Sequence, residues 1–292
     1  MKKFLILFAA FLLAAGFVMA DDLGITVGLE FGIYNVNESN GGIRETWIPG
    51  PNGGNRDPWL NPFASFGGNY LDGALGFFTK VAYQTNFYKG DLEYIPAGLY
   101  FDIALTYNLF LSADSTLSFT VENEMDRLMM TNRPESEDGS GLASIFSPAI
   151  KFDQAVQGAG DFYIDLKFPI TYLAYYKDVD TAVDFEPTLG WNSSFGLGLW
   201  VREVLNLKVP EGAKSGHSEI DVCLSYTKGP FYAEVEADFR KVIYDDGICI
   251  TPLVQYSFIP GLKAWLKCEI DAIGADSIDA VISPAMGVSF SF

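Results

Sequence analysis

The chain has 292 residues, of which 49% are hydrophobic and 15% aromatic, and its formal net charge is −18 at pH 7. So large an acidic excess argues against nucleic acid as a partner and against a basic patch that holds a protein at a membrane surface. The three cysteines, Cys223, Cys249 and Cys268, have no spacing that predicts a disulfide framework or a zinc site.

The first segment has the pattern of an export signal. Lys2 and Lys3 are followed by an apolar run at residues 4–18, and Ala20 completes a cleavage site before Asp21. The apolar run is shorter than the roughly 20 residues of a transmembrane helix, and acidic residues follow it directly. We therefore predict a signal peptide at residues 1–20 and a single domain at residues 21–292.

Alternation of apolar and polar residues begins directly after this signal. Residues 23–34, 70–87 and 99–111 place apolar side chains at odd positions and small or polar ones at even positions. A period of two residues predicts strands rather than helices. Residues 37–69 are rich in Asn, Gly and Pro, and they are predicted to form one long loop.

The alternation continues through the middle of the chain. A turn at residues 113–115 leads to a strand at 117–126, and the next hairpin joins residues 145–153 to 162–175. Residues 183–209 alternate for too long to cross the apolar band of a barrel once, since that band is only about 25 Å tall. We therefore expect this segment to turn back at residues 192–194.

The C-terminal part is predicted to contain five strands, at residues 220–226, 231–239, 248–258, 262–272 and 278–292. Turn residues separate the first four strands at positions 228–229, 245–247 and 260–261. In the last strand Val288, Phe290 and Phe292 lie on the apolar face, and the chain ends on that aromatic residue.

This ending resembles the C-terminal strand of bacterial outer-membrane β-barrel proteins, whose terminal aromatic residue is read by the barrel-assembly machinery. The resemblance is to the porin-like class as a whole, and no motif narrows it to one transporter family. It implies the cell outer membrane as the location. It also implies outer-membrane lipid, periplasmic chaperones and the barrel-assembly machinery as partners.

The predicted fold is therefore all-β, a closed transmembrane antiparallel barrel. A soluble β-sandwich also alternates, but the strands here reach ten residues or more and carry aromatic residues on the apolar face. Closure pairs every strand edge. An even number of strands is expected, either 12 or 14. The larger number is favoured because it places the tight turns on one side, although residues 37–97 do not reveal where the extra strand lies.

The polar face of these strands is strongly acidic. The candidate lumen charges are Glu122, Glu124, Asp126, Glu219, Asp221, Glu234, Glu236, Asp238, Lys263 and Lys267. A turn at residues 228–229 places Glu219 opposite Asp238 and Asp221 opposite Glu236, where like charges repel unless water, cations or basic groups lie between them.

These charges predict a passive channel for ions or small hydrophilic solutes that weakly prefers cations. Two alternatives remain open. The charges can instead pair across a wet interior without selecting ions, or the protein can be a surface-exposed structural or adhesive barrel without an open pore. The sequence does not identify the solute.

No group of residues predicts catalysis, a cofactor or a metal site. His217 and Ser218 are neighbours, so in a strand they point to opposite faces and cannot act as base and nucleophile. The acidic residues at 178–186 lack the glycine and the ligand spacing of a calcium loop. The protein is therefore not expected to be an enzyme.

Overall fold

The computed structural model describes residues 22–33, 58–86, 97–126, 142–174, 179–208, 218–241, 246–273 and 281–292. These residues form strands joined by turns. Among them there is no helix long and apolar enough to cross a membrane. The strand segments are β1 (Asp22–Ile33), β2 (Pro58–Tyr70), β3 (Leu75–Asn86), β4 (Ala97–Ser112), β5 (Ser115–Asp126), β6 (Leu142–Val156), β7 (Gly160–Lys167), β8 (Ile170–Ala174), β9 (Val179–Asn192), β10 (Leu197–Lys208), β11 (Ser218–Lys228), β12 (Phe231–Lys241), β13 (Asp246–Ile259), β14 (Leu262–Ile273) and β15 (Val281–Ser291).

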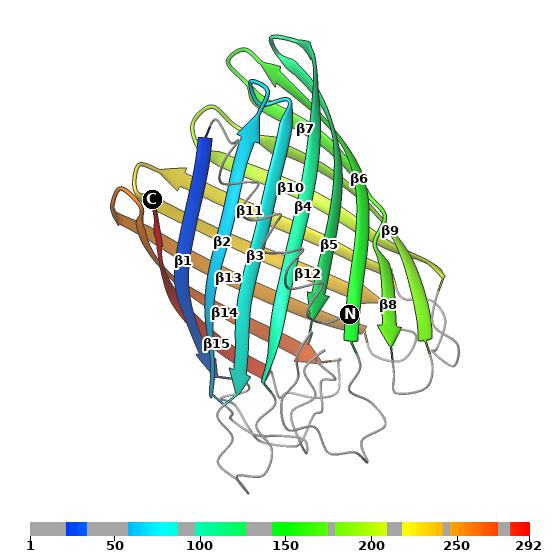
Figure 1. Cartoon of the computed structure of the whole chain (residues 1–292), viewed down its shortest axis with the longest axis vertical. Coiled ribbons are helices and arrows are strands. Elements are labelled where there is room, and N and C mark those ends of the chain that lie inside the picture. The colour runs from blue at the N-terminus through cyan, green and yellow to red at the C-terminus, as the bar shows by residue number, and fades with distance from the viewer. Residues whose placement is uncertain are drawn as a thin grey trace, which may run out of the picture.

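The strands form one closed antiparallel sheet (Figure 1). Successive strands pair with each other, β1 pairs with β15, and β9 pairs with β10. Both β7 and β8 pair with β6 on one side and with β9 on the other, so they are two halves of one strand interrupted at Phe168 and Pro169. The barrel therefore has 14 strands, which confirms the larger of the two expected numbers.

The strand that the sequence did not reveal is β2. It occupies most of the second half of the predicted loop at residues 37–69, so that prediction is wrong from Pro58 onward, while residues 34–57 lie outside the described part of the chain. In β2 the expected polarity is blurred, because Pro62 lies on the apolar outward face and Phe63 on the inward face. A proline and an inward aromatic residue therefore obscure the alternation of apolar and polar residues along β2.

Short turns join β2–β3, β4–β5, β6–β7, β9–β10, β11–β12 and β13–β14, and all of them lie at one end of the barrel. The chain enters β1 and leaves β15 at that same end (Figure 1). The predicted strand at 70–87 contains the first of these turns, since Leu71 and Asp72 have φ values of 53° and 54° and β3 begins at Leu75. The expected reversal within residues 183–209 is confirmed, with the turn between β9 and β10.

The turn between β11 and β12 differs from the predicted one. It consists of Gly229 and Pro230, because Lys228 pairs directly with Phe231. Gly229 has a φ of 57°, as a hairpin turn with glycine at its first central position requires. The expected turn at 245–247 is also corrected, since β13 already begins at Asp246.

The outward face of the wall is apolar. Leu105, Tyr107 and Leu109 alternate on this face of β4 and are 52%, 51% and 41% exposed. Large exposed apolar side chains of this kind recur on strands around the whole barrel. Such a surface is unfavourable in water and suits the hydrocarbon of a bilayer.

Aromatic side chains gather near the end with the short turns. The Trp191 ring lies 6.2 Å from Phe162 and 6.3 Å from Phe195, centroid to centroid, and its Nε1 donates a hydrogen bond of 2.9 Å to the Ala159 carbonyl. Tyr256 with Phe258, and Phe290 with Phe292, form further pairs there. This is the arrangement of an aromatic girdle at one membrane interface.

Candidate functional site: the inward face of the barrel

The inward face is identified by contacts that reach over an intervening strand. The Nζ atom of Lys167 on β7 lies 2.8 Å from an Oε atom of Glu122 on β5, so the two side chains meet in front of β6. Arg202 on β10 approaches Glu236 on β12 in the same way, at 3.8 Å in front of β11. Side chains two strands apart meet on the concave side of a barrel, and these charged residues therefore face the lumen.

Asp221 on β11 is the centre of one acidic group. Its side chain is 0% exposed, and Arg202 holds one of its oxygens, with Nε at 2.7 Å and a terminal guanidinium nitrogen at 2.6 Å. Glu219, Asp221 and Asp238 each bring a carboxylate oxygen to within 4.8 Å of the others. The guanidinium offsets the charge of the buried carboxylate, and the other two side chains remain partly exposed.

The register between β11 and β12 corrects the predicted pairing. Asp221 lies opposite Asp238, not Glu236, and Glu219 lies opposite Arg240. Glu236 lies opposite Cys223. The cause is the turn at Gly229 and Pro230, which shifts the expected partners by two residues along the strand. Like charges still face each other at one position, so the predicted repulsion acts between Asp221 and Asp238 instead of between the expected pairs.

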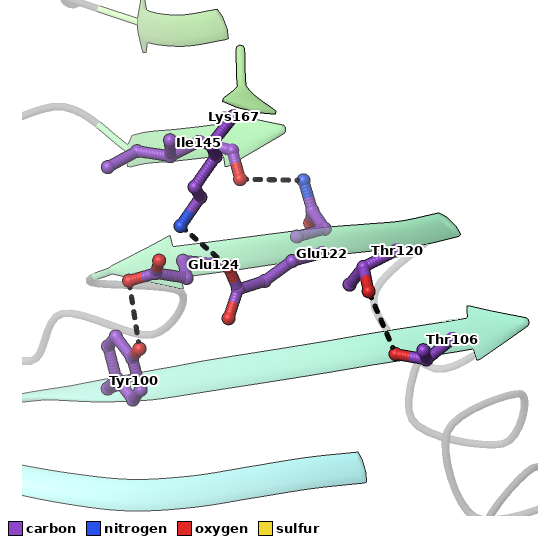
Figure 2. A network of polar contacts seen from close by, with 8 residues as sticks. Tyr100, Thr106, Thr120, Glu122, Glu124, Ile145 and Lys167 are labelled. Carbon is purple, nitrogen blue, oxygen red and sulfur yellow. Dashed lines mark hydrogen bonds and ion pairs between the residues drawn. The ribbon is translucent and has the colours of Figure 1, made fainter. Parts of the chain in front are cut away.

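A second acidic group lies on β4 and β5 (Figure 2). The Tyr100 hydroxyl donates a hydrogen bond of 3.0 Å to Glu124, and Lys167 reaches Glu122 from β7. Asp102 lies opposite Glu124 in the register and is buried. Thr106 and Thr120 continue the same polar row at 3.0 Å, Oγ1 to Oγ1. In the order of strands around the wall, this group is on the opposite side from Asp221.

The other predicted lumen charges are placed as follows. Glu234 faces inward on β12 and accepts a hydrogen bond from the Tyr232 hydroxyl. Lys263 and Lys267 face inward from β14 and are exposed. Asp126 ends β5, and its side chain is not among those described. The structure does not bring all of these residues into one site.

The predicted C-terminal signature, Val288, Phe290 and Phe292, lies on the outward side of the closing strand pair. Backbone hydrogen bonds of 2.9 and 3.0 Å join Phe292 to Ile25 of β1. The last residue therefore takes part in closing the barrel.

The sequence interpretation missed the aromatic side chains of the inward face. Phe63, Tyr100, Tyr163, Trp200, Tyr232 and Trp265 point into the lumen. An aromatic ring is largely apolar, so the alternation favours its placement on the lipid side. Except for Phe63, whose strand has no charged residue, their positions share the parity of charged residues on the same strand, and that parity is the signal available in the sequence.

Inward bases are held against these rings and against acids. Lys80 lies 5.0 Å from the ring centre of Phe63 and 5.9 Å from that of Tyr100. Lys151 forms an ion pair of 2.7 Å with Asp153 and lies 4.7 Å from the Tyr163 ring. These contacts fix the positions of the two lysines, and the Asp153 carboxylate also neutralises the charge of Lys151.

No family model and no curated protein matches this chain. The solved structures that share its fold include three channels. The CymD monoaromatic hydrocarbon channel aligns over 94% of this chain and 89% of its own, with 9% identity and a TM-score of 0.57. The toluene transporter TbuX of Ralstonia pickettii aligns over 94% and 90%, with 10% identity and a TM-score of 0.50. A mutant of the TodX monoaromatic hydrocarbon channel aligns over 95% and 91%, with 8% identity and a TM-score of 0.50. The chain therefore has the closed antiparallel barrel fold of outer-membrane channels, as its final strand predicted.

Proposed function

We propose that this protein is a passive channel in the outer membrane that conducts ions and small hydrophilic solutes and prefers cations. The observation that carries the proposal is the composition of the inward face. The inward acids whose side chains the structure describes are Glu30, Asp102, Glu122, Glu124, Asp153, Asp161, Asp165, Asp184, Glu186, Glu219, Asp221, Glu234, Glu236, Asp238 and Glu269, and the inward bases described are Lys80, Lys151, Lys167, Arg202, Lys263 and Lys267.

The acidic excess acts inside a wall of low dielectric. Field lines from inward charges are focused along a water-filled passage, because the surrounding lipid does not screen them. Lys151, Lys167 and Arg202 are each paired with a carboxylate, and each pair is neutral, so the sign of the potential is set by the excess of the remaining acids over the remaining bases. The net potential favours cations, as rings of carboxylates do in other pores.

The charged lumen also bears on the class of solute. The solved structures that share the fold include channels for monoaromatic hydrocarbons. An apolar solute gains nothing from an inward face that carries carboxylates, and it would have to displace their water. Hydrophilic solutes therefore fit this chain better, and no described group of side chains supports a reaction on them.

The test is the reversal potential of the purified protein in a planar bilayer with a salt gradient. Wild-type channels are expected to give the cation-selective sign. The double variant Glu234→Gln, Asp238→Asn is expected to reduce that selectivity. The matched control is Glu203→Gln, which removes the same kind of charge from the exposed outward face of β10.

Two outcomes contradict the proposal in different ways. Steady channels that prefer anions would refute the proposed cation preference, but the protein would still be a channel. A folded barrel without channels would refute the pore and favour a structural or adhesive role.

A further inference from the structure

Two large aromatic side chains of the inward face lie over glycines of the neighbouring strand. Tyr163 of β7 is directly opposite Gly190 of β9, and Trp265 of β14 is directly opposite Gly287 of β15. A Cβ atom at Gly190 would lie 2.0 Å from Cζ of Tyr163, and one at Gly287 would lie 1.9 Å from Cη2 of Trp265. Each ring fills the space that any side chain larger than that of glycine would need.

The two pairs lie near the barrel mouth that carries the short turns. Tyr163 and Trp265 are each the fourth residue after the turn that precedes their strand, since β7 begins at Gly160 and β14 at Leu262. Five strands, β9 to β13, separate β7 from β14 around the wall. The two rings are therefore on opposite sides of the passage at a similar distance from this mouth.

We propose that Gly190 and Gly287 set the width of the passage at this mouth, because they let the two rings lie against the wall. Any Cβ at these positions forces the ring away from the wall, toward the lumen. The atoms in conflict are at the far end of each ring, so rotation of the aromatic side chain relieves the clash without moving the backbone. The inference rests on the proposed channel and names the residues that limit solute size in it.

A third pair is less suitable for a test. Phe63 lies over Gly28 in the same manner, but a Cβ at Gly28 would also lie 2.8 Å from the Val288 carbonyl oxygen. A substitution there strains the backbone between β1 and β15, so loss of the channel could reflect misfolding.

The first test compares the single-channel conductance of Gly190→Ala, Gly287→Ala and the double variant with that of the wild type. Each single variant is expected to conduct less, the double variant least, and the double variant should exclude smaller neutral polymers. Gly24→Ala is the control, since it is also inward and its Cβ would meet only the Gly67 carbonyl oxygen, at 3.9 Å. Its conductance should equal that of the wild type.

A rescue variant separates ring displacement from general damage. In Gly287→Ala, Trp265→Ala the displaced ring is gone, so conductance should return to at least the wild-type value. Folded Gly→Ala variants with wild-type conductance, or a failure of this rescue, would overturn the proposal.

A second measurement does not depend on conduction. Acrylamide quenching of Trp265 fluorescence, taken as the difference from a Trp265→Phe reference, should rise in Gly287→Ala because the ring moves into water. If the wild type forms no channels, the proposed function fails. The quenching result then tests separately whether Gly287→Ala displaces the Trp265 ring into the lumen. Unchanged quenching would refute that displacement.

Discussion

At the scale of single residues, the buried carboxylate of Asp221 depends on Arg202. A charge without exposure to solvent is stabilised only by its ion pair and hydrogen bonds, and removal of one partner from such a pair costs about 3–5 kcal/mol. By contrast, Lys151 and Asp153 are 39% and 34% exposed, so water replaces either partner at little cost.

We therefore expect Arg202→Met to lower the free energy of unfolding by about 3–5 kcal/mol, and Lys151→Met to lower it by about 1 kcal/mol or less. Urea unfolding of the protein reconstituted in lipid vesicles measures both. The double variant Arg202→Met, Asp221→Leu should recover much of the loss, because no buried charge remains. Equal losses in the two single variants would contradict this account.

Gly229 gives a second residue-scale prediction. Its φ of 57° is in the left-handed region, and no atom lies within 4 Å of the position that a Cβ would take. The cost of substitution therefore comes from the backbone alone. We expect Gly229→Val to lower the free energy of unfolding by about 1–2 kcal/mol, and Gly229→Asn by less, as measured by urea unfolding in vesicles. Equal stability of the wild type and the Gly229→Val variant would contradict the left-handed backbone conformation at this position.

At the scale of elements, closure depends on the pairing of β15 with β1. Phe292 exchanges two backbone hydrogen bonds with Ile25, and its ring lies 5.7 Å from that of Phe290. The two hydrogen bonds join strands from the two ends of the chain, so they form only when β1 and β15 meet, whereas the ring contact is local to the C-terminal end. Phe292 therefore contributes to the strand pairing that closes the barrel.

Deletion of Phe292 is expected to lower the fraction of protein that reaches the heat-modifiable, membrane-inserted form. The deletion removes the backbone hydrogen bonds of Phe292 to β1. It also removes the terminal aromatic residue that, by the resemblance to outer-membrane barrels, the assembly machinery recognises. Electrophoresis with and without heating measures this fraction at native expression. Met286→Ala serves as the control, since it changes an exposed outward side chain of β15 and keeps the terminus. Normal insertion of the deletion variant would count against this role.

At the scale of the whole molecule, the proposed cation selectivity would follow from the summed inward charge rather than from one residue. Salt shortens the range of these charges from about 10 Å at 0.1 M to about 3 Å at 1 M. The reversal potential per unit of salt gradient should therefore fall as the mean salt concentration rises. A selectivity independent of salt would indicate a narrow binding site instead of a diffuse field.

The sequence by itself determined the local properties of this protein. A period of two residues is a property of each strand, and it correctly predicted the antiparallel barrel. The structure places Glu122 and Asp238 on the inward face and Phe290 on the outward face. The prediction failed at β2, where Pro62 on the outward face and Phe63 on the inward face obscure the period.

Only the tertiary structure decided what depends on neighbouring strands. Asp221 faces Asp238 because the turn at Gly229 sets the register between β11 and β12, and a register is a property of two strands together. A shift of two residues keeps every side chain on the same face, so the apolar pattern of either strand does not reveal it. The contact of Trp265 with Gly287 depends on the register between β14 and β15 in the same way. Closure is also a property of the sheet, because the pairing of β1 with β15 joins residues at opposite ends of the chain.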